Sequence, residues 1–156
     1  MSLKIVFMGT PEFSVSALKK LIDNRFNILA VYTRSPKKSK RGQKINVSPV
    51  QAFSEKHNIP IRCPETLNTD KEYNFIKNLS ADIAIVVAYG KLIPKKILKT
   101  TKLGFVNIHA SLLPKWRGAA PIQRAIMEGD KKTGVSIMKI EEKLDSGPVM
   151  SSSELE

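Results

Sequence analysis

The chain has 156 residues, 42% of them hydrophobic, which suffices for one globular domain with a buried core and is too few for two ordinary domains. Cys63 is the only cysteine, so an internal disulfide and a cysteine-rich metal site are excluded, and packing is its simplest role. The net charge of +12 favours a polyanionic partner such as nucleic acid, but it fits equally well a chain whose solvated faces are simply rich in lysine.

The N-terminal segment enters an apolar strand pattern at once and lacks the features of an export signal. The longest apolar run, Ile83 to Tyr89, is far shorter than the roughly 20 residues of a membrane helix. We therefore expect a soluble, cytoplasmic protein without a membrane partner, and we expect it to be a monomer.

The first elements predict a βαβ unit. Lys4 to Met8 is a short apolar strand that stops at Gly9-Thr10-Pro11, and Ser14 to Asp23 carries apolar residues at helical spacing. The β-rich run Ile28 to Thr33 follows directly, so a right-handed crossover and a parallel strand pair are expected.

A cationic segment, Arg34 to Ser48, comes directly after this second strand and reads as one long loop. It contains six basic residues and no acidic ones: Arg34, Lys37, Lys38, Lys40, Arg41 and Lys44. Loops after strands bind ligands in α/β proteins, although most charged loops are merely solvated. On the residues alone, nucleic-acid binding and a solvated loop remain equally good interpretations.

The rest of the chain alternates helices and strands. The uninterrupted run Ile83 to Ala88 predicts a strand in the middle of the sheet, covered on both faces. The alternation indicates an α/β protein with an open, mainly parallel, Rossmann-like sheet and helices on both faces. The expected helices are Pro49 to Lys56, Lys71 to Leu79, Pro94 to Leu98 and Ala119 to Glu128, and the other expected strands are Ile59 to Arg62, Gly104 to Ile108, Gly134 to Ile140 and Gly147 to Ser152.

Three polar residues fall at predicted strand ends, where open α/β sheets form their reactive crevice: Asn107, His109 and Asp145. Asn107 and His109 are two apart in extended chain and should point to the same side, with Ile108 facing the packing. Each residue taken singly is more often a turn or core residue, and their joint placement leaves structural and catalytic interpretations about even.

The residue types suggest a reaction in which the substrate supplies the nucleophile, because no serine or cysteine occupies a nucleophile-elbow context. In acyl transfer to an amine, Asn107 and His109 could donate hydrogen bonds to the oxyanion. Asp145 could pair with His109 and accept the proton that the amine loses. Metal, dinucleotide and P-loop sites have little support, because ligand spacing and glycine patterns are missing.

The stretch from Asn107 to Gln123, read with Leu144-Asp145-Ser146-Gly147, resembles the signature of the formyltetrahydrofolate-dependent formyltransferases. The opening Phe7 to Ser14 and the form Arg117 to Ile122 are similar to those of the members that act on methionyl-tRNA. Val87 to Gly90 and Ser48 to Val50 also fit, and the match runs from Lys4 to about Met150.

The resemblance implies the formyltransferase fold, 10-formyltetrahydrofolate as co-substrate without a metal, and the amino group of initiator methionyl-tRNA as acceptor. It implies Asn107, His109 and Asp145 as the catalytic trio. The folate-binding residues that it implies are Ala88, Tyr89, Gly90, Ser111, Leu112, Leu113 and Pro114, and the tRNA-binding residues are Lys37, Lys38, Lys40, Arg41 and Lys44.

Family members carry further helices and then a C-terminal, barrel-like tRNA-binding domain. Residues 1–156 are therefore expected to form the formyltransferase catalytic domain, incomplete at its C-terminal end and without the tRNA-binding domain. Two alternatives stay open: a formyltransferase acting on a small amine, such as a nucleotide sugar or glycinamide ribonucleotide, and a module that binds folate or RNA without turnover.

Overall fold

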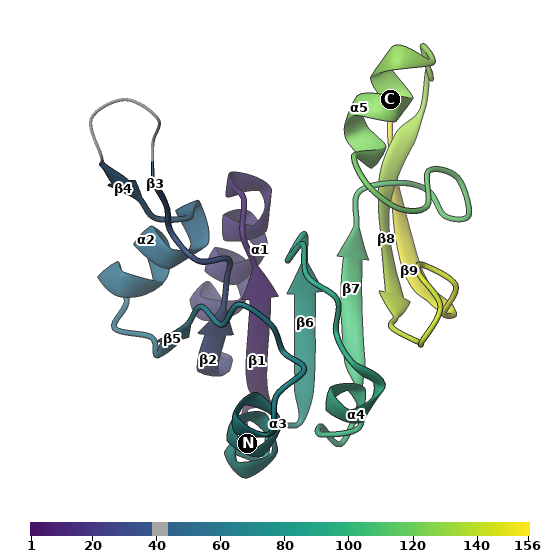
Figure 1. Cartoon of the computed structure of the whole chain (residues 1–156). Coiled ribbons are helices and arrows are strands. Elements are labelled where there is room, and N and C mark those ends of the chain that lie inside the picture. The colour runs from purple at the N-terminus through teal and green to yellow at the C-terminus, as the bar shows by residue number, and fades with distance from the viewer. Residues whose placement is uncertain (39–43) are drawn as a thin grey trace.

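A computed structural model describes residues 1–38 and 44–156 of the chain (Figure 1). Within them, seven strands form one sheet in the order β5-β2-β1-β6-β7-β8-β9. These strands are β1 (Lys4–Gly9), β2 (Asn27–Tyr32), β5 (Ile61–Arg62), β6 (Ile83–Val87), β7 (Phe105–His109), β8 (Thr133–Lys139) and β9 (Val149–Leu155). The helices are α1 (Glu12–Asp23), α2 (Pro49–Lys56), α3 (Asp70–Leu79), α4 (Lys95–Leu98) and α5 (Pro121–Met127).

The sheet is parallel from β5 to β7 and antiparallel at β8 and β9. The prediction of an open, mainly parallel sheet is confirmed, and β6 takes its expected central position. The chain runs outward from β1 through β2 to β5 and then returns to β6 on the other side of β1. This reversal between β1 and β6 opens a crevice at the carboxyl ends of the strands, where such sheets bind ligands.

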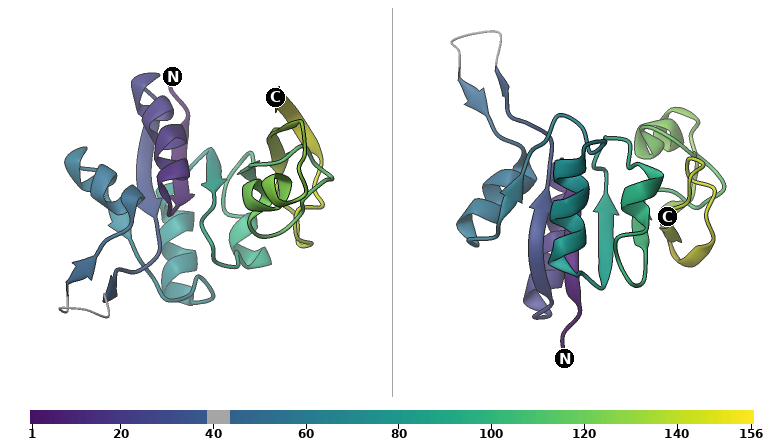
Figure 2. Two further views of the ribbon diagram at one scale, coloured as in Figure 1. Left: turned by 90° about the horizontal axis from the view of Figure 1, so that it is seen from above. Right: turned by 60° about the horizontal axis from the view of Figure 1, so that its bottom comes forward.

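Alternate residues of the strands build two separate cores. Val6 and Met8 of β1 pack on the side of the sheet that α3 and α4 cover, together with Ile76 and Ile97 of those helices. Phe7, between them in the sequence, packs on the opposite side with residues of α1 and α2. Figure 2 shows α1 and α3 on opposite faces of the sheet. The prediction of helices on both faces is therefore confirmed, and the sheet between them is a rigid support for its carboxyl edge.

Local signals in the sequence set the starts of two helices. The Ser48 hydroxyl caps α2 by accepting from the backbone N–H of Gln51 at 3.0 Å, and Pro49 occupies the first helical position, where its missing N–H costs no hydrogen bond. Thr69 caps α3 in the same way, accepting from the backbone N–H of Glu72 at 3.2 Å. Helix α2 begins and ends at the residues that the sequence predicts.

The cationic segment is not the uniform loop that the sequence predicts. Its described flanks form an antiparallel ribbon, in which β3 (Lys37–Lys38) pairs with β4 (Ile45–Asn46). The ribbon projects from the body of the molecule beyond α2 (Figure 1). The prediction of a continuous loop was wrong here because two-residue strands are too short to show an alternating pattern.

Among the described residues, no helix has the length and apolar composition that crossing a membrane would require.

Candidate active site

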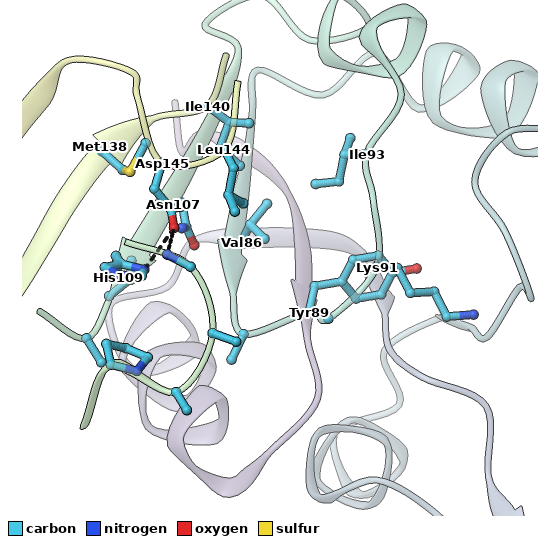
Figure 3. A pocket seen from close by; sticks show the side chains of 18 of the residues that line it. Val86, Tyr89, Lys91, Ile93, Asn107, His109, Met138, Ile140, Leu144 and Asp145 are labelled. Atoms are coloured by element: carbon cyan, nitrogen blue, oxygen red, sulfur yellow. Dashed lines mark hydrogen bonds and ion pairs between the residues drawn. The ribbon is translucent and has the colours of Figure 1, made fainter. Parts of the chain in front are cut away.

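A cavity of about 790 Å³ lies at the carboxyl edge of the sheet, next to the reversal between β1 and β6 (Figure 3). Its walls come from the turn after β1, the segment after β6, the end of β7, the start of α5 and the loop after β8. The lining residues from these elements include Pro11, Phe13, the runs 88–93, 107–110 and 118–123, and the segment 140–145. Cavities of this size hold small organic ligands.

Strand β7 delivers two of the predicted site residues to this cavity. Asn107 is half-buried and His109 is buried, and both line the cavity wall. Ile108 packs against the core cluster beneath α1 and α2, and it also borders the cavity. This arrangement follows from the alternation of side chains along an extended strand, as the sequence predicts.

Asp145 reaches the same end of the cavity from the loop after β8 (Figure 3). Its Oδ2 lies 3.9 Å from Nδ1 of His109, and the two side chains are 9% and 8% exposed. The same oxygen accepts a hydrogen bond of 2.6 Å from the backbone N–H of Gly118. The structure thus brings the predicted trio together and adds a backbone donor that orients the carboxylate.

The other ring nitrogen of His109 is held by the loop that follows β7. Its Nε2 lies 2.8 Å from the backbone carbonyl oxygen of Trp116. A carbonyl oxygen only accepts hydrogen bonds, so Nε2 carries a proton in this arrangement. The nitrogen that faces Asp145 is therefore Nδ1, which is unprotonated in the neutral ring and becomes a donor only in the imidazolium.

The segment after β6 forms a fixed wall of the cavity, and it contains the predicted residues Ala88, Tyr89 and Gly90. Ala88 and Gly90 have φ angles of 48° and 77°, in the left-handed region. Two side chains hold the backbone here: Thr10 donates to the carbonyl of Tyr89 at 3.0 Å, and Arg34 donates to the carbonyl of Gly90 at 2.8 Å. The wall is thus tied both to the turn after β1 and to the start of the cationic segment.

The predicted folate residues Ser111 to Pro114 lie outside the cavity lining. Ser111 is fully buried, and its hydroxyl donates to the carbonyl of Lys115 at 2.6 Å. The Ser136 hydroxyl of β8 in turn donates to the carbonyl of Ser111 at 2.7 Å. The structure therefore gives this stretch a supporting position behind the site, and its contact with folate stays a prediction.

Two apolar residues of the cavity carry no signal in the sequence as site residues. Ile93 and Met138 lie far apart along the chain, outside the motifs that carry the family resemblance, and both line the cavity. Each has the pattern of an ordinary helix, strand or loop residue, because it is the topology that gathers them. Only the placement of the strand ends at one edge could have pointed to their neighbourhood.

Tyr89 combines burial with an unusual electrostatic environment. Its side chain is almost fully buried, and its hydroxyl has no hydrogen-bond partner among the residues that the structure describes. Burial, and next the nearby negative charge of Glu72, raise the pKa of Tyr89 well above its ordinary value. Tyr89 therefore stays neutral and serves as part of the apolar wall.

The described part of the chain contains no cluster of three His, Cys, Asp or Glu side chains able to hold a metal ion. Of the predicted nucleic-acid residues, Lys37, Lys38 and Lys44 are exposed and lie on or beside the ribbon. The other two, Lys40 and Arg41, fall outside the described residues, and the role of the whole set stays a prediction.

An open α/β sheet with a cavity at its topological reversal, lined by an amide, an imidazole and a carboxylate, defines the class of Rossmann-like proteins with a reactive crevice. The family described as "Formyl transferase" matches residues 3–156, and the chain belongs to this family.

Relatives and solved structures agree with this assignment. Methionyl-tRNA formyltransferase of Pelagibacter ubique is 63% identical over 150 residues, covering 96% of this chain and 48% of the relative. The protein of the same name from Methylobacterium nodulans is 49% identical over 149 residues, with 96% and 48% covered. The chain thus spans about half the length of these curated relatives.

Two solved structures share the fold at low sequence identity. Phosphoribosylglycinamide formyltransferase from Bacillus halodurans has a TM-score of 0.76 at 22% identity, covering 97% of this chain and 79% of that one. A formyltetrahydrofolate deformylase from Pseudomonas syringae also has a TM-score of 0.76, at 20% identity, with 99% and 51% covered. The α/β formyltransferase fold is therefore confirmed.

Proposed function

We propose that this chain binds 10-formyltetrahydrofolate in the cavity and transfers the formyl group to the amino group of initiator methionyl-tRNA, within a protein of the length of its relatives. The observation that carries the proposal is the convergence of Asn107, His109 and Asp145 on one end of the cavity. The names of the relatives that are 63% and 49% identical support formyl transfer as the reaction and methionyl-tRNA as the acceptor.

The reaction follows from these three side chains. The amine nitrogen attacks the formyl carbon, and the formyl oxygen becomes an oxyanion. The Asn107 amide donates to this oxygen, and His109 donates through Nδ1–H when the ring is doubly protonated. Asp145 then accepts the proton that the amine loses, directly or through water.

The intermediate collapses when the bond between the formyl carbon and the N10 nitrogen of the folate breaks. That nitrogen takes up a proton, which offsets the proton that the amine has lost. The products are tetrahydrofolate and formylmethionyl-tRNA. No group of the chain becomes covalently attached, which agrees with a cavity whose described lining residues include no serine, threonine or cysteine.

The exposed lysines of the ribbon support tRNA as the acceptor. Lys37, Lys38 and Lys44 add positive charge to an element that projects from the sheet and is joined to the cavity wall through Arg34. This positively charged ribbon attracts the phosphates of tRNA. Part of the affinity for tRNA should therefore fall as the salt concentration rises.

A formyl-transfer assay with charged initiator tRNA, glycinamide ribonucleotide and a nucleotide amino sugar tests the proposal. The expected result is transfer to methionyl-tRNA at a kcat/KM far above that for either small amine. Preference for a small amine would overturn the acceptor, and folate binding without transfer to any amine would overturn the enzymatic function.

A further inference from the structure

We propose that Asp130 is a positioning residue for His109: its carboxylate holds the indole of Trp116, whose backbone carbonyl fixes the imidazole. The catalytic consequence of this chain of contacts rests on the proposed function, whereas the contacts themselves do not. Asp130 lies outside the cavity lining, so it would act on the reaction only through Trp116 and His109.

The backbone of Asp130 is fixed by the end of α5. Gly129 has a φ of 68°, and its N–H donates to the carbonyl of Ile126 at 3.1 Å. The N–H of Asp130 donates to the carbonyl of Ala125, a buried residue of α5, at 3.0 Å. This pair of hydrogen bonds is the glycine-based helix ending known as the Schellman motif. It holds the carboxylate at a defined place beneath the loop after β7.

Both oxygens of this carboxylate are engaged by that loop. Oδ2 accepts from the indole Nε1–H of Trp116 at 2.8 Å, and Oδ1 accepts from the ammonium of Lys115 at 2.6 Å. The Asp130 side chain is only 13% exposed. The hydrogen bond from Lys115, and next that from Trp116, lower the pKa of Asp130 below its ordinary value. The carboxylate is therefore charged at neutral pH, and each of its oxygens accepts a hydrogen bond from a different side chain.

The contact with Trp116 matters because its backbone is in a conformation that side chains disfavour. Trp116 has a φ of 58°, in the left-handed region, and this places its carbonyl 2.8 Å from Nε2 of His109. A residue other than glycine keeps such a conformation only where its surroundings hold it. Among the described residues, the indole of Trp116 donates to Asp130 and also lies beneath the Lys115 ammonium, 5.1 Å from the ring centroid. The carbonyl of Trp116 is held by its contact with His109.

The far end of the same loop is anchored separately. Ser136 of β8 donates to the carbonyl of Ser111 and accepts from the backbone N–H of Leu113 at 3.0 Å. Removal of the Asp130 carboxylate should therefore free the part of the loop near Trp116 while Ser111 stays in place. The expected effect is local to His109, whose ring would lose its fixed Nε2–H acceptor.

The test compares Asp130→Ala, Asp130→Asn and Trp116→Phe. Asparagine keeps an acceptor for the indole N–H, and phenylalanine keeps the ring but removes that N–H. His109 and His57 are the only histidines, so a His57→Gln background assigns the His109 ring signals in NMR spectra. Trp116 is the only tryptophan, so its fluorescence reports the clamp directly.

We expect the Nε2–H proton of His109 to exchange with water at least about tenfold faster in Asp130→Ala and Trp116→Phe, and Asp130→Asn to restore most of the protection. The double variant Asp130→Ala, Trp116→Phe should show no more effect than Asp130→Ala alone, because Asp130→Ala already removes the contact that Trp116→Phe breaks. Additive effects, or unchanged exchange in the single variants, would overturn the inference. Asp70→Ala, which removes an exposed partner of Lys96, is the matched control and should leave His109 unchanged.

Formyl transfer by the full-length protein supplies the second readout. Asp130→Ala should lower kcat by about tenfold with folate affinity little changed, because the ring is displaced and the cavity is retained. If the wild-type protein transfers no formyl group while the variants show the expected NMR changes, the proposed function is overturned and the positioning role of Asp130 is retained. Normal NMR exchange with normal kcat in Asp130→Ala would overturn the positioning role alone.

Discussion

Nδ1 of His109 lies 3.9 Å from Oδ2 of Asp145, and both side chains are less than a tenth exposed. Asp145→Asn preserves the volume of the side chain and an oxygen that can accept from the backbone N–H of Gly118. It removes the negative charge and the base. We expect folate affinity within about twofold of wild type and a kcat of formyl transfer lower by at least about 100-fold. Equilibrium folate titration and single-turnover transfer in the full-length protein measure the two quantities.

Asp70→Asn is the control for this change, since Asp70 is exposed on α3 and pairs only with Lys96 among the described residues. Its kinetics should match wild type. Near-normal turnover by Asp145→Asn would contradict the role of Asp145 as base, and a large loss of folate affinity would give it a binding role instead.

The cationic segment is the second feature with a measurable consequence. Changing Lys37, Lys38, Lys40 and Arg41 to Gln should weaken binding of initiator tRNA by the full-length protein. The slope of log K against log salt should become shallower by roughly 0.7 to 0.9 for each phosphate that is no longer neutralised. Folate binding should stay unchanged, because Lys37 and Lys38, the two of these residues that the structure describes, do not line the cavity. Fluorescence titrations at several salt concentrations give the slope.

Four exposed basic residues elsewhere provide the charge-matched control: Lys20, Lys71, Lys77 and Lys99. Their change to Gln lowers the net charge by the same amount but leaves the ribbon intact. Equal effects of the two sets would mean that total charge, rather than the ribbon, attracts the tRNA.

The sequence predicted the fold well wherever local chemistry decides the structure. The start of helix α2 follows from the cap at Ser48 and the proline at position 49. The central position of β6 follows from its continuous apolar run, which is typical of a strand buried on both faces. The ribbon of β3 and β4 was missed because each of its strands has only two residues, too few to show an alternating pattern.

In the site, too, some features follow from the local sequence and others depend on contacts between distant residues. The placement of Asn107 and His109 on one side of β7 follows from strand geometry. The contacts of His109 with Trp116 and of Asp145 with Gly118 do not, because they depend on left-handed backbone at Trp116 and Asp145. Neither residue is a glycine, so the sequence carries no sign of these conformations.

Substitution of Gly147 shows whether the path of the loop after β8 determines the position of Asp145. A Cβ at this buried position would overlap the carbonyl oxygen of Lys139. Gly147→Ala should therefore push the loop off β8, move Asp145 away from His109 and lower the free energy of unfolding by about 1–3 kcal/mol. Urea unfolding and formyl transfer should both show the loss.

Ser146→Ala is the neighbouring control, because the Ser146 hydroxyl makes only an exposed hydrogen bond to Lys143 among the described residues. Its stability should stay within about 0.5 kcal/mol of wild type. Wild-type stability and turnover in Gly147→Ala would mean that the loop adapts to an added methyl group, and that its path does not fix Asp145.

Glu72 links β2, β5 and α3 through a buried hydrogen-bond network. Its carboxylate accepts from the Tyr32 hydroxyl at 2.7 Å and from Arg62 through two nitrogens, at 2.9 and 2.6 Å. Burial alone would raise the pKa of Glu72, but the hydrogen bonds from Arg62 and Tyr32 outweigh it and hold the pKa below the ordinary value of 4.5. Glu72→Gln should cost about 2–3 kcal/mol of unfolding free energy at neutral pH, because it weakens a largely buried charged pair.

The pH dependence of that cost has a definite sign. A carboxyl whose pKa is lower in the folded than in the unfolded chain contributes stability that is fully present above the unfolded value and is lost as pH falls through the folded value. The stability difference between wild type and Glu72→Gln should therefore be constant above about pH 5.5 and shrink below the ordinary value of 4.5. Urea unfolding across this range measures it. A difference that stays constant at low pH would mean that packing, and not the charge of Glu72, sets the cost of the substitution.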